Sequence, residues 1–173
     1  MRAIALIAAA LALAGVGFAS AGSVPACRGA SMAATFTVLP GSPRAGNIVY
    51  TLRLRNRGHV ACFVSGLPTL RLLGRSGNPL PTHVRAGHPG RLTAVRVVLA
   101  PGGYASASAR FSPDVPGPGE AGPCEPVAYR VRIVVPPGGG TASGPVDPPT
   151  RVCEHGSLAM TTLVAGKKGP STA

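Results

Sequence analysis

Short runs of alternating apolar and polar residues, separated by Pro and Gly, constrain the fold of this chain more than any other feature. In the run 50–57, the apolar residues Tyr50, Leu52 and Leu54 alternate with Thr and Arg. Because successive side chains of a β-strand point to opposite faces, such a run has one face to bury and one to hydrate. No segment beyond residue 21 keeps a helical apolar period over ten or more positions. The alternation recurs in residues 70–72, 95–99, 105–111 and 129–135.

Two further strands are predicted at 32–39 and 157–164, and turn residues separate the runs. The turn Pro101-Gly102-Gly103 lies between two alternating runs and predicts a hairpin. The Pro- and Gly-rich stretches 112–123 and 136–149 predict long surface loops. Seven or eight short strands with such turns indicate an all-β, antiparallel β-sandwich.

The apolar faces of these strands predict the hydrophobic core. Each member lies on the apolar side of an alternating run, so we expect it to be buried. The predicted core consists of Phe36, Val38, Tyr50, Leu52, Leu54, Leu70, Leu72, Val95, Val97, Leu99, Val131 and Ile133.

The first residues have the organisation of an export signal. A short basic start precedes the apolar run Ala3–Ala14, and Ala19-Ser20-Ala21 is a small-x-small cleavage site. The apolar run is too short to cross a bilayer. We therefore expect a signal peptide over 1–21 that is cleaved after Ala21, a secreted β-sandwich domain over 22–164, and a disordered basic tail over 165–173.

The chain has four cysteines, which behind an export signal are expected in an oxidising compartment. They therefore predict two disulfides and not a metal site. Four cysteines allow three connectivities, and all three remain open at this point. They are Cys27, Cys62, Cys124 and Cys153.

The chain carries 17 Lys and Arg against 5 Asp and Glu, a formal net charge of +12. A charge of that size favours attraction to polyanions. The alternative is a solvated surface enriched in Arg by genome composition. No basic segment contains interspersed aromatic residues, so no specific nucleic-acid binding is expected.

Several short motifs occur in an order that is similar to a known family. Asn56-Arg57-Gly58 ends a strand, and Leu99-Ala100-Pro101-Gly102-Gly103 and Pro136-Pro137 follow later. Together with the spacing of the cysteines and Cys-x-x-x-Gly-x-Pro over 62–68, they make residues 27–164 resemble the actinobacterial secreted domain of unknown function 4232. The resemblance implies an immunoglobulin-like β-sandwich, secreted or lipid-anchored, with no assigned biochemical activity.

Lipid-anchored members carry a lipobox, which Val24-Pro25-Ala26-Cys27 resembles. Pro25 fits that motif poorly, and lipidation of Cys27 would leave an odd number of thiols in an oxidising space. We therefore favour cleavage after Ala21 over lipidation.

The expected topology predicts the disulfide pairing Cys62–Cys124 and Cys27–Cys153. Cys62 follows one strand and Cys124 precedes another, and the two points are expected at one end of the sandwich. Cys27 and Cys153 each precede a terminal strand, and the two terminal strands are expected to run side by side.

The polar faces of three runs carry arginines that would share one surface in an immunoglobulin-like sheet. Like charges that lie directly opposite destabilise a sheet, so a partner or solvent must relieve them. We therefore predict a polyanion-binding surface, with envelope phosphates, anionic lipids and acidic glycans as the available ligands. Its residues are Arg53, Arg55, Arg71, Arg130 and Arg132.

No catalytic, metal-binding or cofactor-binding pattern emerges. The spacings of the histidines match no zinc-ligand pattern, and the acids lie in Pro- and Gly-rich segments where no catalytic pair is expected. We expect a non-enzymatic envelope or extracellular module that binds a polyanion or a protein partner. The alternative is an accessory domain that pairs with a partner through a β edge and has no ligand site. The histidines are His59, His83, His88 and His155, and the acids are Asp114, Glu120, Glu125, Asp147 and Glu154.

Overall fold

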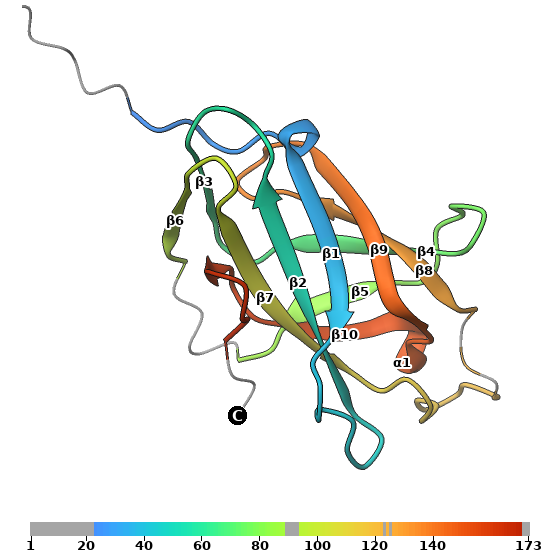
Figure 1. The fold of residues 1–173 in the computed structure, drawn as a ribbon. Coiled ribbons are helices and arrows are strands. Elements are labelled where there is room, and N and C mark those ends of the chain that lie inside the picture. The colour runs from blue at the N-terminus through green and yellow to red at the C-terminus, as the bar shows by residue number, and fades with distance from the viewer. Residues whose placement is uncertain (1–22, 89–93, 123, 125, 171–173) are drawn as a thin grey trace, which may run out of the picture.

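The computed structural model describes residues 23–88, 94–122, 124 and 126–170, and these form an all-β fold (Figure 1). Its helical elements are single turns, η1 (Gly29–Ser31) and α1 (Cys153–Gly156). The all-β prediction is therefore confirmed. The strands are β1 (Met32–Val38), β2 (Ile48–Asn56), β3 (Cys62–Ser65), β4 (Thr69–Leu73), β5 (His83–Ala86), β6 (Arg96–Leu99), β7 (Tyr104–Phe111), β8 (Ala128–Val134), β9 (Thr141–Thr150), β10 (Ser157–Met160) and β11 (Val164–Ala165).

Most strands belong to one mixed sheet with the order β4-β8-β9-β1-β2-β7-β10-β5, in which β11 also pairs with β7. Strands β3 and β6 form a separate two-stranded sheet. The neighbours β1–β9 and β10–β5 are parallel, so the prediction of purely antiparallel strands is wrong. Each parallel pair joins segments far apart in the chain, where no tight turn forces the antiparallel direction.

The sheet curls so that its two ends approach each other. In Figure 1, β1, β2, β7 and β9 run side by side, and β4, β5 and β10 cross behind them. The end strands β4 and β5 follow each other in the chain. The connection between them stays close to β4, because Leu80 N–H donates to the Leu72 carbonyl (2.9 Å) and Leu72 N–H donates to the Thr82 hydroxyl (3.0 Å). The result is an almost barrel-like sheet around one core.

The core confirms most of the alternation seen in the sequence. Strands β1, β2 and β7 are in register so that Phe36 lies opposite Leu52 and Leu52 lies opposite Ala107. The small alanines of β7 leave room for large side chains from its neighbours. In the same core, Phe36 of β1 and Tyr50 of β2 stack with ring centroids 4.9 Å apart, and the ring of Phe111, at the end of β7, lies 5.3 Å from that of Tyr50.

Of the predicted core residues, ten are buried. Val38 is only partly buried, and Val95 is 51% exposed because it precedes β6 and does not lie within it. The buried residues are Phe36, Tyr50, Leu52, Leu54, Leu70, Leu72, Val97, Leu99, Val131 and Ile133.

The prediction of a loop over 136–149 is wrong, because β9 begins within it. Ala142 and Val146 of β9 are buried, and Gly144 lies between them on the same face. A Cβ atom at Gly144 would collide with the carbonyl oxygen of Ala34 on β1. Glycine is therefore required where two strands approach closely, although its abundance made the segment resemble a loop.

The predicted hairpin at Pro101–Gly103 is also wrong. Strand β6 pairs with β3 and strand β7 pairs with β2, so this turn passes between the two sheets. The end of β2 holds the turn, because Gly102 N–H donates to the Asn56 carbonyl (2.8 Å) and Asn56 N–H donates to the Gly103 carbonyl (3.0 Å).

Both disulfides form, but the predicted pairing is wrong. Cys27 pairs with Cys62 and Cys124 pairs with Cys153, with Cα–Cα distances of 4.8 and 5.1 Å. The segment before β1 runs parallel to β3. Cys27 of this segment forms a backbone hydrogen bond with β3, and Phe63 of β3 forms one with the segment. These bonds place Cys27 beside Cys62. The prediction failed because it treated residues 62–65 as a connection and not as a strand.

The C-terminal segment is placed on the sheet, which corrects the prediction of a disordered tail for residues 165–170. Val164 and Ala165 pair with β7. Beyond them, the Ser108 hydroxyl donates to the Pro170 carbonyl (2.7 Å) and Arg53 Nε donates to the Lys167 carbonyl (2.8 Å). The segment therefore covers part of the outer face of β2 and β7.

The two disulfides indicate an oxidising, extracytoplasmic compartment, because cytosolic thiols are kept reduced. In the described part of the chain, no helix combines the length and apolar character needed to span a bilayer. The predicted signal peptide over 1–21 lies outside the described residues.

Candidate functional site

The five arginines of the predicted binding surface fall into two separate groups. Arg53 and Arg55 lie on β2, and Arg71, Arg130 and Arg132 lie on β4 and β8. Strands β9 and β1 stand between β8 and β2, so the predicted adjacency of these runs is wrong. The prediction failed because β9 was not recognised as a strand.

The group on β4 and β8 contains a direct opposition of like charges. Arg71 and Arg132 are cross-strand neighbours, and both side chains are exposed. Arg130 lies opposite Leu73, two residues before Arg132 and on the same face of β8. The one ion pair among the described residues is between His155 and Glu120, so no carboxylate in that part of the chain neutralises these arginines. Like-charge pairs of this kind are destabilising unless solvent or a bound anion screens them.

The group on β2 is joined by residues that the sequence prediction did not include. Arg55 lies opposite Tyr104, with its Cζ atom 5.7 Å from the centre of the half-buried Tyr104 ring. The Lys167 ammonium lies 4.8 Å from the same ring centre, and the Lys167 carbonyl accepts a hydrogen bond from Arg53. We call Arg53, Arg55, Tyr104 and Lys167 the Tyr104 cluster. Two cations thus lie over one aromatic ring, whose face attracts them, and Arg53 is tied to the same group through Lys167.

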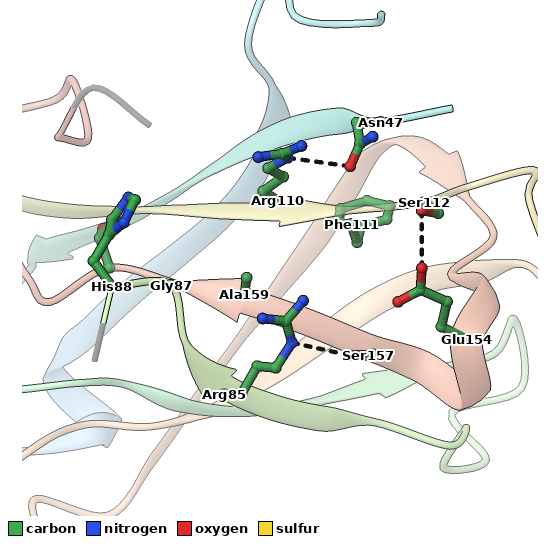
Figure 2. A pocket seen from close by; sticks show the side chains of 11 residues that line it. Asn47, Arg85, Gly87, His88, Arg110, Phe111, Ser112, Glu154, Ser157 and Ala159 are labelled. Carbon is green, nitrogen blue, oxygen red and sulfur yellow. Dashed lines mark hydrogen bonds between the residues drawn. The ribbon is translucent and has the colours of Figure 1, made fainter. Parts of the chain in front are cut away.

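A third basic region lies at the opposite end of β7. Ala159 of β10 pairs with Arg110 of β7 on one side and with Arg85 of β5 on the other. The methyl group of Ala159 leaves a hollow between the two longer side chains, as Figure 2 shows. This hollow is part of a cavity of about 230 Å³, which we call the Ala159 pocket. Its lining also includes Asn47, His88, Ser112, Glu154, Ser157 and Thr161.

Hydrogen bonds orient both arginines of the Ala159 pocket. Arg110 Nε donates to Asn47 Oδ1 (3.1 Å), and Arg85 Nε donates to the Ser157 hydroxyl (3.4 Å). In the described residues, neither guanidinium forms an ion pair with a carboxylate. Their terminal nitrogens are therefore available for a carboxylate or a phosphate, which arginine binds through two parallel hydrogen bonds.

Glu154 lies at the other end of the pocket from His88 (Figure 2). Its Oε1 atom accepts a hydrogen bond from the Ser112 hydroxyl (3.4 Å). Glu154 belongs to α1, where Glu154 and His155 have φ values of 53° and 55°. Such left-handed conformations persist in non-glycine residues only where the surroundings hold them.

Glu120 provides this support. Its Oε2 atom accepts hydrogen bonds from the Gly117 and Glu154 N–H groups (2.6 and 2.7 Å), and Oε1 accepts one from His155 N–H. The hydrogen bond from Gly117, followed by the one from His155, lowers the pKa of the Glu120 carboxyl below its usual value of 4.5. The Cys124–Cys153 disulfide ties the same turn to the loop before β8. Both contacts position Glu154 at the pocket.

The Ala159 pocket was not predicted from the sequence. Arg110 was visible on the polar side of an alternating run, but its neighbours come from β10 and β5, which pair in parallel over a long sequence separation. Nothing in the local sequence around Arg85 points to that pairing. Among the described residues, no three His, Cys, Asp or Glu side chains lie together as a metal site would require.

Comparison with known proteins identifies a family for nearly all of the described chain. The model of the family described as Domain of unknown function (DUF4232) matches residues 27–164. No curated protein matches the sequence. The matched range contains both disulfides and the Ala159 pocket, and it ends before Lys167 of the Tyr104 cluster.

Proposed function

The chain belongs to the DUF4232 family, and we propose that it is a secreted, non-enzymatic module that binds anionic polymers or surfaces outside the cell. The observation that carries this proposal is the Tyr104 cluster. Arg55 and Lys167 lie over one ring on the outer face of the sheet, and Arg53 adds a third positive charge through its hydrogen bond to the Lys167 carbonyl. The excess of 17 basic over 5 acidic residues adds a long-range attraction to the same ligands.

Export is part of the proposal. We propose a signal peptide over 1–21 with cleavage after Ala21, and the two disulfides support it because they require an oxidising compartment. The immunoglobulin-like description of the fold is likewise proposed. It is supported by strands that pack on two sides of a single core (Figure 1).

Binding to anionic vesicles tests the proposed function. The wild-type protein is expected to bind vesicles that contain phosphatidylglycerol at low salt, and to release them at high salt because exposed charges are screened. Arg53→Ser/Arg55→Ser is expected to weaken binding about twofold to thirtyfold, since it removes two contacts and each exposed contact contributes about 0.2–1 kcal/mol.

The control is Arg28→Ser/Arg44→Ser, which removes the same charge from exposed positions outside the cluster. Equal losses in the two double variants would show that only net charge matters. Binding that ignores salt would reject the polyanion proposal altogether. Heparin in place of vesicles separates acidic glycans from lipids as the ligand.

A second candidate function is pairing with a partner protein through a β edge. The observation that favours it is the exposure of β6, where Val98 is 53% exposed and Val95, just before the strand, is 51% exposed. Among the described residues, β6 pairs only with β3. Unpaired edges of this kind accept another strand. Cross-linking at Val98→Cys would capture such a partner.

A further inference from the structure

We propose that the Ala159 pocket is a discrete site for a small hydroxylated oxyanion, such as a sugar acid or a sugar phosphate. The site is separate from the polymer-binding surface proposed above. The Tyr104 cluster lies at the first residue of β7, whereas Arg110 lies near its last residue.

The strand register creates the anion-binding half of the site. Arg110, Ala159 and Arg85 are adjacent positions on three neighbouring strands. Neighbouring strands are about 4.8 Å apart, so the two arginine Cα atoms are about 10 Å apart with only a methyl group between them. A phosphate or carboxylate seated over that methyl group is within reach of both guanidinium groups. Any larger side chain at position 159 would occupy its place.

Hydrogen bonds hold both arginines in place before a ligand binds. Arg110 is held through Nε by Asn47, and Arg85 is held through Nε by Ser157. Ordering a long side chain on binding costs free energy, and hydrogen bonds that form beforehand reduce this cost. Because the bonds use Nε, the terminal nitrogens remain for the ligand.

The opposite half of the pocket carries a negative hydrogen-bond acceptor instead of positive donors. Glu154 accepts a hydrogen bond from Ser112 and lies beyond the arginines in Figure 2. A carboxylate at this place accepts hydrogen bonds from ligand hydroxyl groups and repels a second anionic group. The pocket therefore favours a ligand with its charge at one end and hydroxyl groups at the other.

The size of the pocket limits the ligand. A volume of about 230 Å³ is smaller than the range of about 300–1,000 Å³ that is typical of sites for drug-sized molecules. A single sugar ring with one acidic group matches this space better than an extended polymer does.

Titration with inorganic phosphate, glucuronate and glucose, followed by NMR of backbone amides, tests the proposal. Phosphate and glucuronate are expected to bind saturably, with shifts centred on Arg85, Arg110 and Ala159. Glucuronate is expected to shift Glu154 in addition, and glucose, which lacks the charge, is expected to bind at least about tenfold more weakly.

The decisive variant is Ala159→Leu, which fills the hollow and leaves the net charge unchanged. It is expected to weaken phosphate and glucuronate binding at least about tenfold, as is Arg110→Gln, which keeps the hollow and removes a charge. Arg71→Gln is the matched control, because Arg71 is exposed on β4, outside the pocket. It should bind both ligands as the wild type does.

Wild-type affinity in Ala159→Leu or in Arg110→Gln would overturn the proposal. The absence of saturable binding of both anions would also overturn it. Shifts that spread over the Tyr104 cluster, with equal losses in Arg71→Gln and Arg110→Gln, would mean that the anions respond only to surface charge. Vesicle binding by Ala159→Leu is measured in parallel. It tests the proposed polyanion binding independently of the Ala159 pocket.

Discussion

The two ends of β7 carry positive charge in different ways. At Tyr104, the side chains of Arg55 and Lys167 both lie over one aromatic ring. Near the other end, Arg110 is separated from Arg85 by Ala159, so the place between the cations is empty space. The first arrangement is a filled, exposed surface, and the second is a recess.

In our proposal, the residue beside the cations decides which kind of ligand each end of β7 accepts. An aromatic ring supports cations in solvent, where contacts are weak, screened by salt and tolerant of ligand shape. A methyl group creates a hollow in which oriented donors surround one ligand group.

The inner face of β2 should dominate stability and the outer face should dominate binding. Leu52 is fully buried, and truncation of such a side chain typically costs about 2–5 kcal/mol. Leu52→Ala should therefore lower the melting temperature strongly, whereas Arg53→Ala should change it little. Thermal unfolding followed by circular dichroism makes the comparison, and equal shifts in the two variants would show that the faces of β2 are assigned wrongly.

The two disulfides should have similar effects on stability but different effects on the pocket. They close loops with sequence separations of 35 and 29, and the chain-entropy relation assigns about 3–4 kcal/mol to each. Cys124→Ser/Cys153→Ser frees the turn that carries Glu154, so it should also weaken glucuronate binding. Cys27→Ser/Cys62→Ser should leave that binding unchanged in the folded protein.

Peptide mapping under non-reducing conditions checks the connectivity itself. A peptide that joins Cys62 to Cys124 would contradict the structure.

The contrast between local and long-range pairing also explains which features could be predicted from the sequence. Strands β1, β2 and β7 alternate apolar and polar residues along the sequence, and their core faces were predicted because period-two patterning is local information. The burial of Thr51, Ser106 and Ser108 on the polar faces of β2 and β7 was not predicted. Strand β9 was missed because close packing requires Gly144, and glycine in a Pro-rich segment resembles a loop. Strands β3 and β5 were not predicted either.

The candidate sites were predicted only as far as single strands allow. The outward direction of Arg53 and Arg55 follows from their alternation with Leu52 and Leu54. The contact of Lys167 with the same cluster depends on the return of the C-terminal segment over β7. The Ala159 pocket depends on a parallel pairing that brings β5 beside β10, and no local pattern encodes it.

Lys167 should contribute to polymer binding and not to binding in the Ala159 pocket. Lys167→Ala removes the exposed ammonium that lies over Tyr104, and with it an exposed charge contact to the ligand worth up to about 1 kcal/mol. Vesicle binding should weaken about twofold to fivefold, and phosphate affinity at the Ala159 pocket should stay unchanged. A loss of phosphate affinity in this variant would mean that the two ends of β7 are not independent.

The smallest effect is expected at Glu120. Its pKa is lowered in the folded protein, so its contribution to stability is present above pH 4.5 and is lost as the pH falls below that value. Amide chemical shifts of Gly117 and His155 should therefore change together on acidification below about pH 4.5, the ordinary pKa of this carboxyl. Glu120→Gln should show the altered shifts already at neutral pH, and wild-type shifts in that variant would contradict the assigned hydrogen bonds.

Mapping the binding of two ligands on the wild-type protein tests most directly whether the two ends of β7 bind different anions. Backbone amide shifts are recorded during titration of the wild-type protein with heparin and, separately, with inorganic phosphate. Heparin should first perturb Tyr104, Arg55 and Lys167, and phosphate should first perturb Arg110, Ala159 and Arg85. Identical sets of perturbed residues for the two ligands would contradict the conclusion that β7 carries two different kinds of anion site.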